Sequence, residues 1–495
     1  MIGYSKHFNT IVIGVGGMGS ATCYYLAKRG KRVLGLERFD IPHDLGSSHG
    51  YTRIIRLAYY EHPSYVMLLK RSYDLWDEIE ARTGQQLLYK NGSIDAGPAD
   101  SWVFKGALRS AVEHELEHDV LTGAEVNARW PGYQLPHYTM ALFQPDGGFL
   151  VPERATVAFA EAAHSFGAEI HGRETVLGWE PVGDGVRVFT DRAEYTADSL
   201  VITAGAWNNT VLPFLRDLAV PERQVLAWLQ PERPELFRPE NFPVFNLLVP
   251  EGRYYGFPVF AVPGFKFGMY HHFQEHGAPE TLDFEPRWED EEALREFAAR
   301  YFPQGAGPTM TLKACMFTNS PDKHFIIDLH PQYPQVSFAA GFSGHGYKFA
   351  SVIGEIMADL AERQETRHDI RLFNVARFTG QVSKLWEDYP GRHTLTRAGR
   401  RGMTGTHLPA GEHSTPRKGR VSSRQFSSTR QGKPGHPHGP APRYSGQLAT
   451  RATPQRHPLS VPRGRPLSQS QQGYGHFNDS TDPLYWERDS VETFW

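Results

Sequence analysis

Three glycines and one glutamate near the start of the chain have the types and spacing that bind a dinucleotide. Gly14, Gly16 and Gly19 form a G-x-G-x-x-G motif, and Glu37 follows about 20 residues later. Such glycines allow a tight turn, close backbone approach to a pyrophosphate, and close packing of a helix on a strand. The free N–H groups of the following helix attract phosphate, and the carboxylate can bind a ribose hydroxyl. The motif predicts a dinucleotide site and leaves FAD and NAD as alternatives.

The elements that must position this motif are present around it. Residues 10–13 form a β-branched apolar run, which is typical of a strand buried on both faces. Residues 20–29 are predicted to be helical, and residues 32–36 form a second strand that ends at Glu37. Strand, glycine turn, helix, strand and acid therefore occur in the order that a dinucleotide-binding unit requires.

Two later segments are expected to reach the same site. The segment 46–56, GSSHGYTRIIR, follows the second strand closely, and its Arg53 and Arg56 lie one helical turn apart. The loop 341–346, GFSGHG, follows a buried strand at 336–340 and precedes a helix at 347–362, so it directs another helix N-terminus at a ligand. Between these segments, predicted strands present Tyr255, Lys266, His271 and His272.

The pattern of apolar residues predicts two lobes and an α/β plus α+β fold. Residues 8–84, 146–220 and 318–378 are expected to form a discontinuous, Rossmann-like dinucleotide-binding domain, with a helix at 58–83. Residues 85–145 and 221–317 are expected to form a substrate domain with a mixed or antiparallel sheet and a charged helix at 288–301.

Composition excludes several classes of protein. The 495 residues carry a net charge of −3, and no run of 18 apolar residues predicts a transmembrane helix. We expect a cytoplasmic protein, because neither a signal peptide nor a C-terminal peroxisomal tripeptide is recognised. Cys23 and Cys315 are the only cysteines, which excludes a disulfide framework. No CxxC or HExxH motif occurs, so no metal site is expected.

The C-terminal part differs in composition from the rest. Residues 391–473 contain 15 Lys and Arg against one acid, Glu412, and are rich in Pro, Gly, Ser and Gln. Such a segment buries too little apolar surface to fold, so residues 379–495 are predicted to be a disordered basic tail. A basic arm that binds nucleic acid is the functional alternative, although no aromatic interleaving supports it. A tail that is not native coding sequence is a third possibility.

Six motifs in order carry a family resemblance. GVGGMG, GSSHGYTRIIR, YYGFP, GFKFG, KACMFTNSPDKHFIID and GFSGHGYKFAS resemble the monomeric sarcosine oxidase and N-methyltryptophan oxidase family of D-amino-acid-oxidase-like flavoproteins. The resemblance covers residues 8–378. Within it, ARWPG, NSPD and KFASVIGEI favour the N-methyltryptophan oxidase branch.

The resemblance implies roles for particular residues. Cys315 matches the cysteine that bonds covalently to the flavin, and Lys313 and Lys323 nearby in sequence are expected to lower its pKa. Lys348 and Arg56 match ligands of the substrate carboxylate, and Lys266 matches the lysine that activates oxygen. The remaining catalytic positions implied are Arg53 against the flavin ring, His49 near the flavin, Tyr255 in the substrate pocket, and His271 or His272 as the pocket histidine.

The resemblance also implies which residues bind FAD. They are Gly14, Gly16, Gly19, Glu37, Arg38, Ser47, Ser48, Cys315, Gly344, His345, Gly346 and Lys348. Tyr51 stands where many relatives carry an acid, and the segment after Lys266 is one residue longer before its histidine.

The resemblance implies a flavin-dependent amine oxidase that acts on CH–NH groups with oxygen as acceptor. Secondary N-methyl amino acids of the N-methyltryptophan type would be demethylated to the primary amino acid, formaldehyde and hydrogen peroxide. Sarcosine or pipecolate oxidation is the alternative within enzymes. An NAD-linked dehydrogenase would leave Cys315 and Lys266 without a role, and a non-catalytic nucleic-acid-binding protein would use the basic tail. We expect a monomer whose partners are the amino acid and oxygen, with no membrane or nucleic acid.

Overall fold

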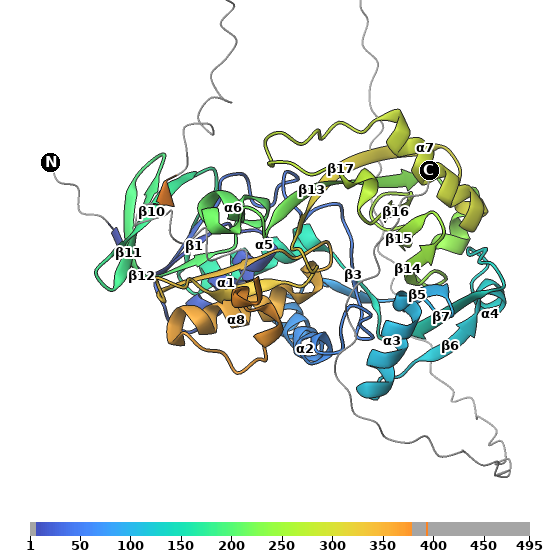
Figure 1. Cartoon of the computed structure of the whole chain (residues 1–495), viewed down its shortest axis with the longest axis horizontal. Helices are drawn as coiled ribbons and strands as arrows, with labels where there is room; N and C mark the ends of the chain where they lie inside the picture. Colours follow the sequence, from blue (N-terminus) through green and yellow to red (C-terminus); the bar gives the residue numbers. More distant parts are fainter. Residues whose placement is uncertain (1–5, 379–392, 395–495) are drawn as a thin grey trace, which may run out of the picture. The chain divides into compact units, whose positions relative to one another are not determined.

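A computed structural model describes residues 6–378 and 393–394, and these form two large sheets, one small sheet and the helices around them (Figure 1). The predicted tail, residues 379–495, lies outside the described residues apart from His393 and Thr394. No helix of the described part is long and apolar enough to cross a membrane.

The first large sheet has nine strands and a parallel centre in the order β9-β2-β1-β12-β19. The antiparallel strands β11 and β10 extend it beyond β12, β18 pairs with β19, and β20 pairs with β10. The last residues of β1 and β12 are buried, and residues 11–13 and 200–202 form continuous apolar runs there. The strands are β1 (Lys6–Ile13), β2 (Val33–Leu36), β9 (Glu169–His171), β10 (Val176–Val182), β11 (Gly185–Thr190), β12 (Glu194–Ile202), β18 (Ile326–Leu329), β19 (Val336–Ala340) and β20 (His393–Thr394).

Four helices pack beside this sheet; α1 packs against α5 and α8, and its side chains also bond to Glu78 of α2. Gly354 of α8 allows the closest contact, because an added Cβ would lie 2.5 Å from Ala21 Cβ of α1. Alanine-rich faces on α1 and α5 likewise permit close packing. The helices are α1 (Gly17–Lys28), α2 (Tyr65–Thr83), α5 (Pro152–Ser165) and α8 (Ala350–Arg363).

The second large sheet has eight strands in the order β17-β13-β16-β15-β14-β5-β7-β6. Every pair is antiparallel except β14 with β5. Phenylalanines from several strands and from α7 fill its core with edge-to-face and tilted ring pairs. The elements are β5 (Ser93–Pro98), α3 (Trp102–Glu113), β6 (Asp119–Thr122), α4 (Gly123–Arg129), β7 (Thr139–Gln144), β13 (Val220–Leu229), β14 (Val244–Val249), β15 (Gly252–Phe257), β16 (Phe265–Met269), α7 (Trp288–Tyr301) and β17 (Thr309–Asn319).

Short elements connect these parts. A three-stranded sheet is formed by β3 (Arg53–Ile55), β8 (Gly148–Leu150) and β4 (Leu88–Lys90). The remaining short helices are η1 (Gly205–Trp207), α6 (Asn208–Val211), η2 (Pro213–Leu215), η3 (Pro234–Phe237), η4 (His272–Gln274), η5 (Pro303–Gly305), η6 (Tyr347–Phe349), η7 (Arg371–Phe373) and η8 (Val375–Phe378).

The predicted fold class is confirmed, with two local corrections. The helix expected over 58–83 begins only at Tyr65, since Pro63 disfavours helical backbone in the residue before it. The helix expected over 347–362 is a 3₁₀ turn followed by α8. The division into two domains and the boundaries given for them stay predictions.

Candidate functional site

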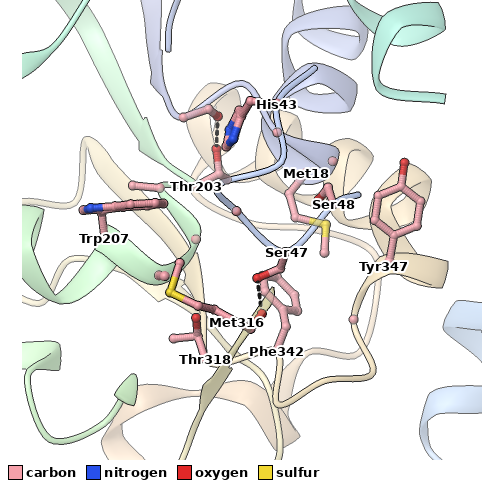
Figure 2. Close-up of a pocket in the computed structure, with 18 of the residues that line it drawn as sticks. Met18, His43, Ser47, Ser48, Thr203, Trp207, Met316, Thr318, Phe342 and Tyr347 are labelled. Atoms are coloured by element: carbon pink, nitrogen blue, oxygen red, sulfur yellow. Dashed lines mark hydrogen bonds between the residues drawn. The ribbon is translucent and has the colours of Figure 1, made fainter. Parts of the chain in front are cut away.

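One cavity collects residues from both large sheets. Its lining comes from the glycine turn after β1, the end of β2, the loop 41–48, the end of β12, strands β15 and β17, and the loop 341–348. Figure 2 shows Trp207 and Tyr347 on opposite sides of this cavity, with Met316 and Thr318 of β17 along it. Segments far apart in sequence therefore meet where a large ligand can lie.

The glycine turn has the backbone geometry that a pyrophosphate requires. Gly14 has a φ of +87°, and Gly19 packs so closely that an added Cβ would lie 1.8 Å from the Gly14 carbonyl oxygen. In front of Gly16 there is open space, and no side chain caps α1. The first turn of α1 lines the cavity, so its N–H groups are left for an anion.

Glu37 is fixed at the end of β2 by two backbone donors. Its Oε2 accepts from the Val15 N–H at 2.9 Å, and its Oε1 accepts from the Phe39 N–H at 3.0 Å. The buried carboxylate also lines the cavity and retains acceptor capacity for a ribose hydroxyl. The uncapped helix, the open space at Gly16 and this carboxylate fit a dinucleotide.

The second glycine-rich loop closes on the same cavity. Gly344 has a φ of +78°, and an added Cβ there would lie 2.4 Å from the Phe317 ring. His345 is buried, with Nδ1 2.6 Å from the Tyr59 hydroxyl and Nε2 2.9 Å from the Lys323 carbonyl oxygen. Its pKa is lowered to about 3, chiefly by burial, so the ring is neutral.

The tight contact at Gly19 gives a stability prediction. Gly19→Ala is expected to lower the melting temperature of the apoprotein, because the new methyl group must displace backbone; overpacking typically costs about 1–3 kcal/mol. Thermal unfolding followed by circular dichroism measures this change. Gly16→Ala is the matched control, since its methyl group meets no protein atom within 4 Å. Equal melting temperatures for the two apoproteins would contradict the prediction.

Cys315 lies on β17 and faces the cavity. Its side chain is 2% exposed, and burial raises the pKa of its thiol against the opposing effect of Arg53 and Lys266. Lys313 also lowers this pKa, but Lys323 is not among the groups that act on it. The expectation of a depressed thiol pKa was therefore wrong, because desolvation outweighs the nearby cations.

Arg53 and His49 occupy different positions around the cavity. Arg53 lines it, and its Nη1 and Nη2 donate to the carbonyl oxygens of Thr52 at 2.9 Å and Ser47 at 2.8 Å. His49 instead lines an adjoining hollow and is 1% exposed, and neither of its ring nitrogens has a hydrogen-bond partner among the residues that the structure describes. Burial first, and then Arg53, lowers the pKa of His49 to about 3.

Lys266 is buried beneath the loop that precedes β3. Its Nζ donates to the carbonyl oxygens of Gly50 at 2.7 Å and Thr52 at 2.9 Å, and to Thr52 Oγ1 at 2.9 Å. Within the described residues it forms no ion pair, and Nζ lies 4.2 Å from the centre of the Phe257 ring. Burial, followed by Arg53, lowers the pKa of Lys266 well below its usual value.

Lys348 and Arg56 are not brought to the cavity together. Lys348 lines it, and its Nζ donates to the His345 carbonyl oxygen at 2.8 Å. Arg56 is 1% exposed and does not line the cavity, since its guanidinium lies 2.9 Å from Glu61 and 3.4 Å from Asp95. Burial, and then Arg56, lowers the pKa of Lys348 to about 7.

Neither of the two candidates for the pocket histidine lines the cavity. His271 has a φ of +57° and turns its Nδ1 to Glu222 at 2.9 Å, while His272 is buried with its Nε2 2.8 Å from Asp290. Tyr255 lines the cavity as predicted, and so does Tyr270, which sequence reasoning missed. Tyr270 follows Lys266 and Gly268 at the two-residue spacing of a strand, and that spacing was the available signal.

The other predicted cofactor residues lie along the cavity. Ser47 Oγ donates to the Met316 carbonyl oxygen at 2.7 Å (dashed in Figure 2), and Ser48 also lines the cavity. Arg38 lines the cavity as well and pairs with Glu280 at 2.9 Å. Thr203 and Trp207, at the end of β12, were not predicted as site residues. The described part of the chain contains no cluster of His, Cys, Asp and Glu that could hold a metal ion.

Comparison with known proteins defines the class of this fold and site. The FAD dependent oxidoreductase family matches residues 9–360, and the chain belongs to this family. Monomeric sarcosine oxidase of Streptomyces avermitilis is 42% identical over 75% of this chain and 98% of that enzyme. N-methyl-L-tryptophan oxidase of Yersinia pestis (strain Pestoides F) is 35% identical over 75% of this chain and 99% of that enzyme. The solved structure of L-proline dehydrogenase from P. horikoshii matches 76% of the chain and 99% of that structure, with a TM-score of 0.67 and 22% identity, and so shares the fold.

These findings confirm the predicted resemblance, the flavin-dependent oxidase class and FAD as the cofactor of the family. The covalent link through Cys315 stays a prediction. The preference for the N-methyltryptophan branch gains no support from the identities, which are higher for the sarcosine oxidase.

Proposed function

We propose that the protein is an FAD-dependent oxidase that demethylates secondary N-methyl amino acids. The products would be the primary amino acid, formaldehyde and hydrogen peroxide. The observation that carries this proposal is the joint presence, in one cavity, of the dinucleotide-binding turn, Cys315 and the carboxylate-binding candidate Lys348. When bound, the flavin accepts a hydride equivalent from the substrate and passes electrons to oxygen.

The chain's own residues would bind and orient the reactants. The first turn of α1 and Glu37 would hold the pyrophosphate and a ribose of FAD, and Cys315 would form the covalent bond. Lys348 would bind the substrate carboxylate, with Arg56 entering the site only if it leaves Glu61. Lys266 would place a positive charge beside the oxygen that becomes reduced.

The finer assignment is an N-methyltryptophan-like substrate, with sarcosine and pipecolate as the alternatives. The aromatic lining formed by Tyr255, Tyr270 and Phe317 supports a side chain larger than that of sarcosine. Peroxide formation from a panel of these three substrates tests the reaction and ranks them. An absorption spectrum with flavin bands retained after acid precipitation tests the cofactor, and colourless protein inactive on the whole panel would refute the proposal.

The pKa of Lys348 predicts that carboxylate binding depends on pH. Its pKa of about 7 means that the charged form, which binds a carboxylate, dominates below pH 7 and falls about tenfold per pH unit above it. The dissociation constant of acetate, a carboxylate without an amine, is therefore expected to rise roughly 50-fold from pH 7 to 9, since half of Lys348 is already uncharged at pH 7. Lys348→Met is expected to bind acetate weakly at every pH. A titration of the flavin spectrum measures both, and an identical pH profile in the variant would rule out this role.

A further inference from the structure

A buried charged cluster adjoins the substrate end of the cavity. Four charged groups act on the pKa of Lys348, namely Arg56, Arg253, Glu61 and Asp95. Together these five form what we call the carboxylate-site cluster. It contains three cations and two carboxylates, so one positive charge is in excess when all five are ionised.

The two carboxylates are already engaged by Arg56. Glu61 lies 2.9 Å from Arg56 Nη2, and Asp95 lies 3.4 Å from Arg56 Nε. Asp95 Oδ1 also accepts from Asn246 Nδ2 at 2.8 Å. Neither carboxylate therefore neutralises Lys348 or Arg253 by direct contact.

Arg253 is surrounded by aromatic rings and not by carboxylates among the described residues. Its guanidinium carbon lies 3.6 Å from the centre of the Tyr270 ring, 5.0 Å from that of Trp102 and 5.8 Å from that of Tyr60. In the described part of the chain it forms no ion pair, and its hydrogen bond to the Tyr60 hydroxyl is long, at 3.5 Å. A half-buried arginine without a carboxylate is an open site for an anion.

Tyr270 connects this arginine with the cavity. Its ring lines the cavity, and its hydroxyl lies 3.3 Å from Asn246 Oδ1. The Arg253 guanidinium packs against this ring, so the Tyr270 side chain lies between its positive charge and the cavity. Burial lowers the pKa of Lys323 most; the buried carboxylate of Glu222 raises it, and Arg253 lowers it. Because Glu222 offsets Lys323, the excess positive charge at this end of the cavity is that of Arg253.

The net charge of a substrate determines how well it matches the carboxylate-site cluster. A zwitterionic N-methyl amino acid with a neutral side chain adds no net charge, and its α-carboxylate would occupy Lys348. A side-chain carboxylate brings the one negative charge that the carboxylate-site cluster lacks. We propose that Arg253 is a specificity-determining residue that favours N-methyl amino acids with an acidic side chain, such as N-methylaspartate and N-methylglutamate. This inference rests on the proposed function and adds to it a preference for an acidic side chain over a small neutral one.

The test compares kcat/KM for N-methylaspartate and N-methylglutamate with that for the neutral N-methylalanine. In the wild-type holoenzyme the acidic substrates are expected to be preferred. Arg253→Met should reduce the acidic-to-neutral ratio by roughly 10- to 100-fold, as expected for one charge acting at an effective dielectric constant of about 20. The loss should fall on KM more than on kcat, because the charge is present before and during the reaction.

Three further variants separate charge from packing. Arg253→Lys retains the charge and should recover much of the ratio, whereas Arg253→Gln retains donors without charge and should not. Arg238→Met removes an exposed arginine elsewhere and should leave the ratio unchanged. Flavin content and melting temperature are measured for each variant, and the ratio is taken only from folded holoenzyme.

Two results would overturn the inference while leaving the proposed function intact. One is a wild-type enzyme that oxidises N-methylalanine better than both acidic substrates. The other is an acidic-to-neutral ratio that is the same in wild type, Arg253→Met and Arg253→Gln. Absence of peroxide from every N-methyl amino acid would instead refute the proposed function itself.

Discussion

Replacement of Cys315 by alanine is expected to give protein whose flavin is released by acid and whose turnover is largely lost. The thiol faces the cavity from β17 and is the cysteine positioned to bond a bound flavin, whereas Cys23 is enclosed in α1. After precipitation with acid, the flavin absorbance should remain in the pellet of the wild type and move to the supernatant of Cys315→Ala.

Cys23→Ala is the matched control, because this buried thiol does not line the cavity. It should keep acid-stable flavin. Burial raises the pKa of the Cys315 thiol, and only the thiolate is nucleophilic, so attachment to apoprotein should accelerate as pH rises toward that pKa. Acid-stable flavin in Cys315→Ala would place the covalent link at another residue.

Substitution of Lys266 should separate the two halves of the catalytic cycle. In Lys266→Met, substrate is expected to reduce the flavin at nearly the wild-type rate, while reoxidation by oxygen slows by roughly 10²–10³-fold. The reason is that negative charge develops on oxygen only in the oxidative step, where a preorganised cation stabilises it. Stopped-flow mixing of reduced enzyme with oxygen measures the rate directly.

The surroundings of Lys266 determine the controls. Methionine leaves the Gly50 and Thr52 oxygens without their donor, which costs about 1–3 kcal/mol for each buried group, so Lys266→Gln is made in parallel. Lys313→Met removes a surface lysine paired with Asp44 and should reoxidise normally. If reduced Lys266→Met reoxidises at the wild-type rate, the role fails, and His49, beside the same loop, becomes the next candidate.

Local patterns in the sequence predicted the elements that carry the cofactor site. Residues 10–37 contain the strand, turn, helix and acid in one continuous unit, and the structure places Glu37 on the Val15 N–H next to the glycine turn. Helix α7 was predicted at its observed bounds, Trp288–Tyr301, because its charged face and apolar spacing are both local features.

Pairings between distant segments could not be predicted. Arg56 is held by Asp95 of β5, and only the folded second sheet brings that carboxylate to it. The side chain of His271 leaves the cavity because the backbone after β16 turns into the left-handed region, which nothing in the sequence marks. The resemblance assigned roles to positions, but it carried no information on which partner each side chain would contact.

The two large sheets both contribute to the wall of the cavity, so a bound FAD would make the stability of the folded protein depend on cofactor supply. A ligand that binds only the folded state stabilises it by mass action, so protein that has not yet received FAD is expected to unfold more readily. Apoprotein would open more often and meet cellular proteases in that state. Growth medium and flavin nutrition would thus set how much enzyme survives in a cell, as well as how much of it is active.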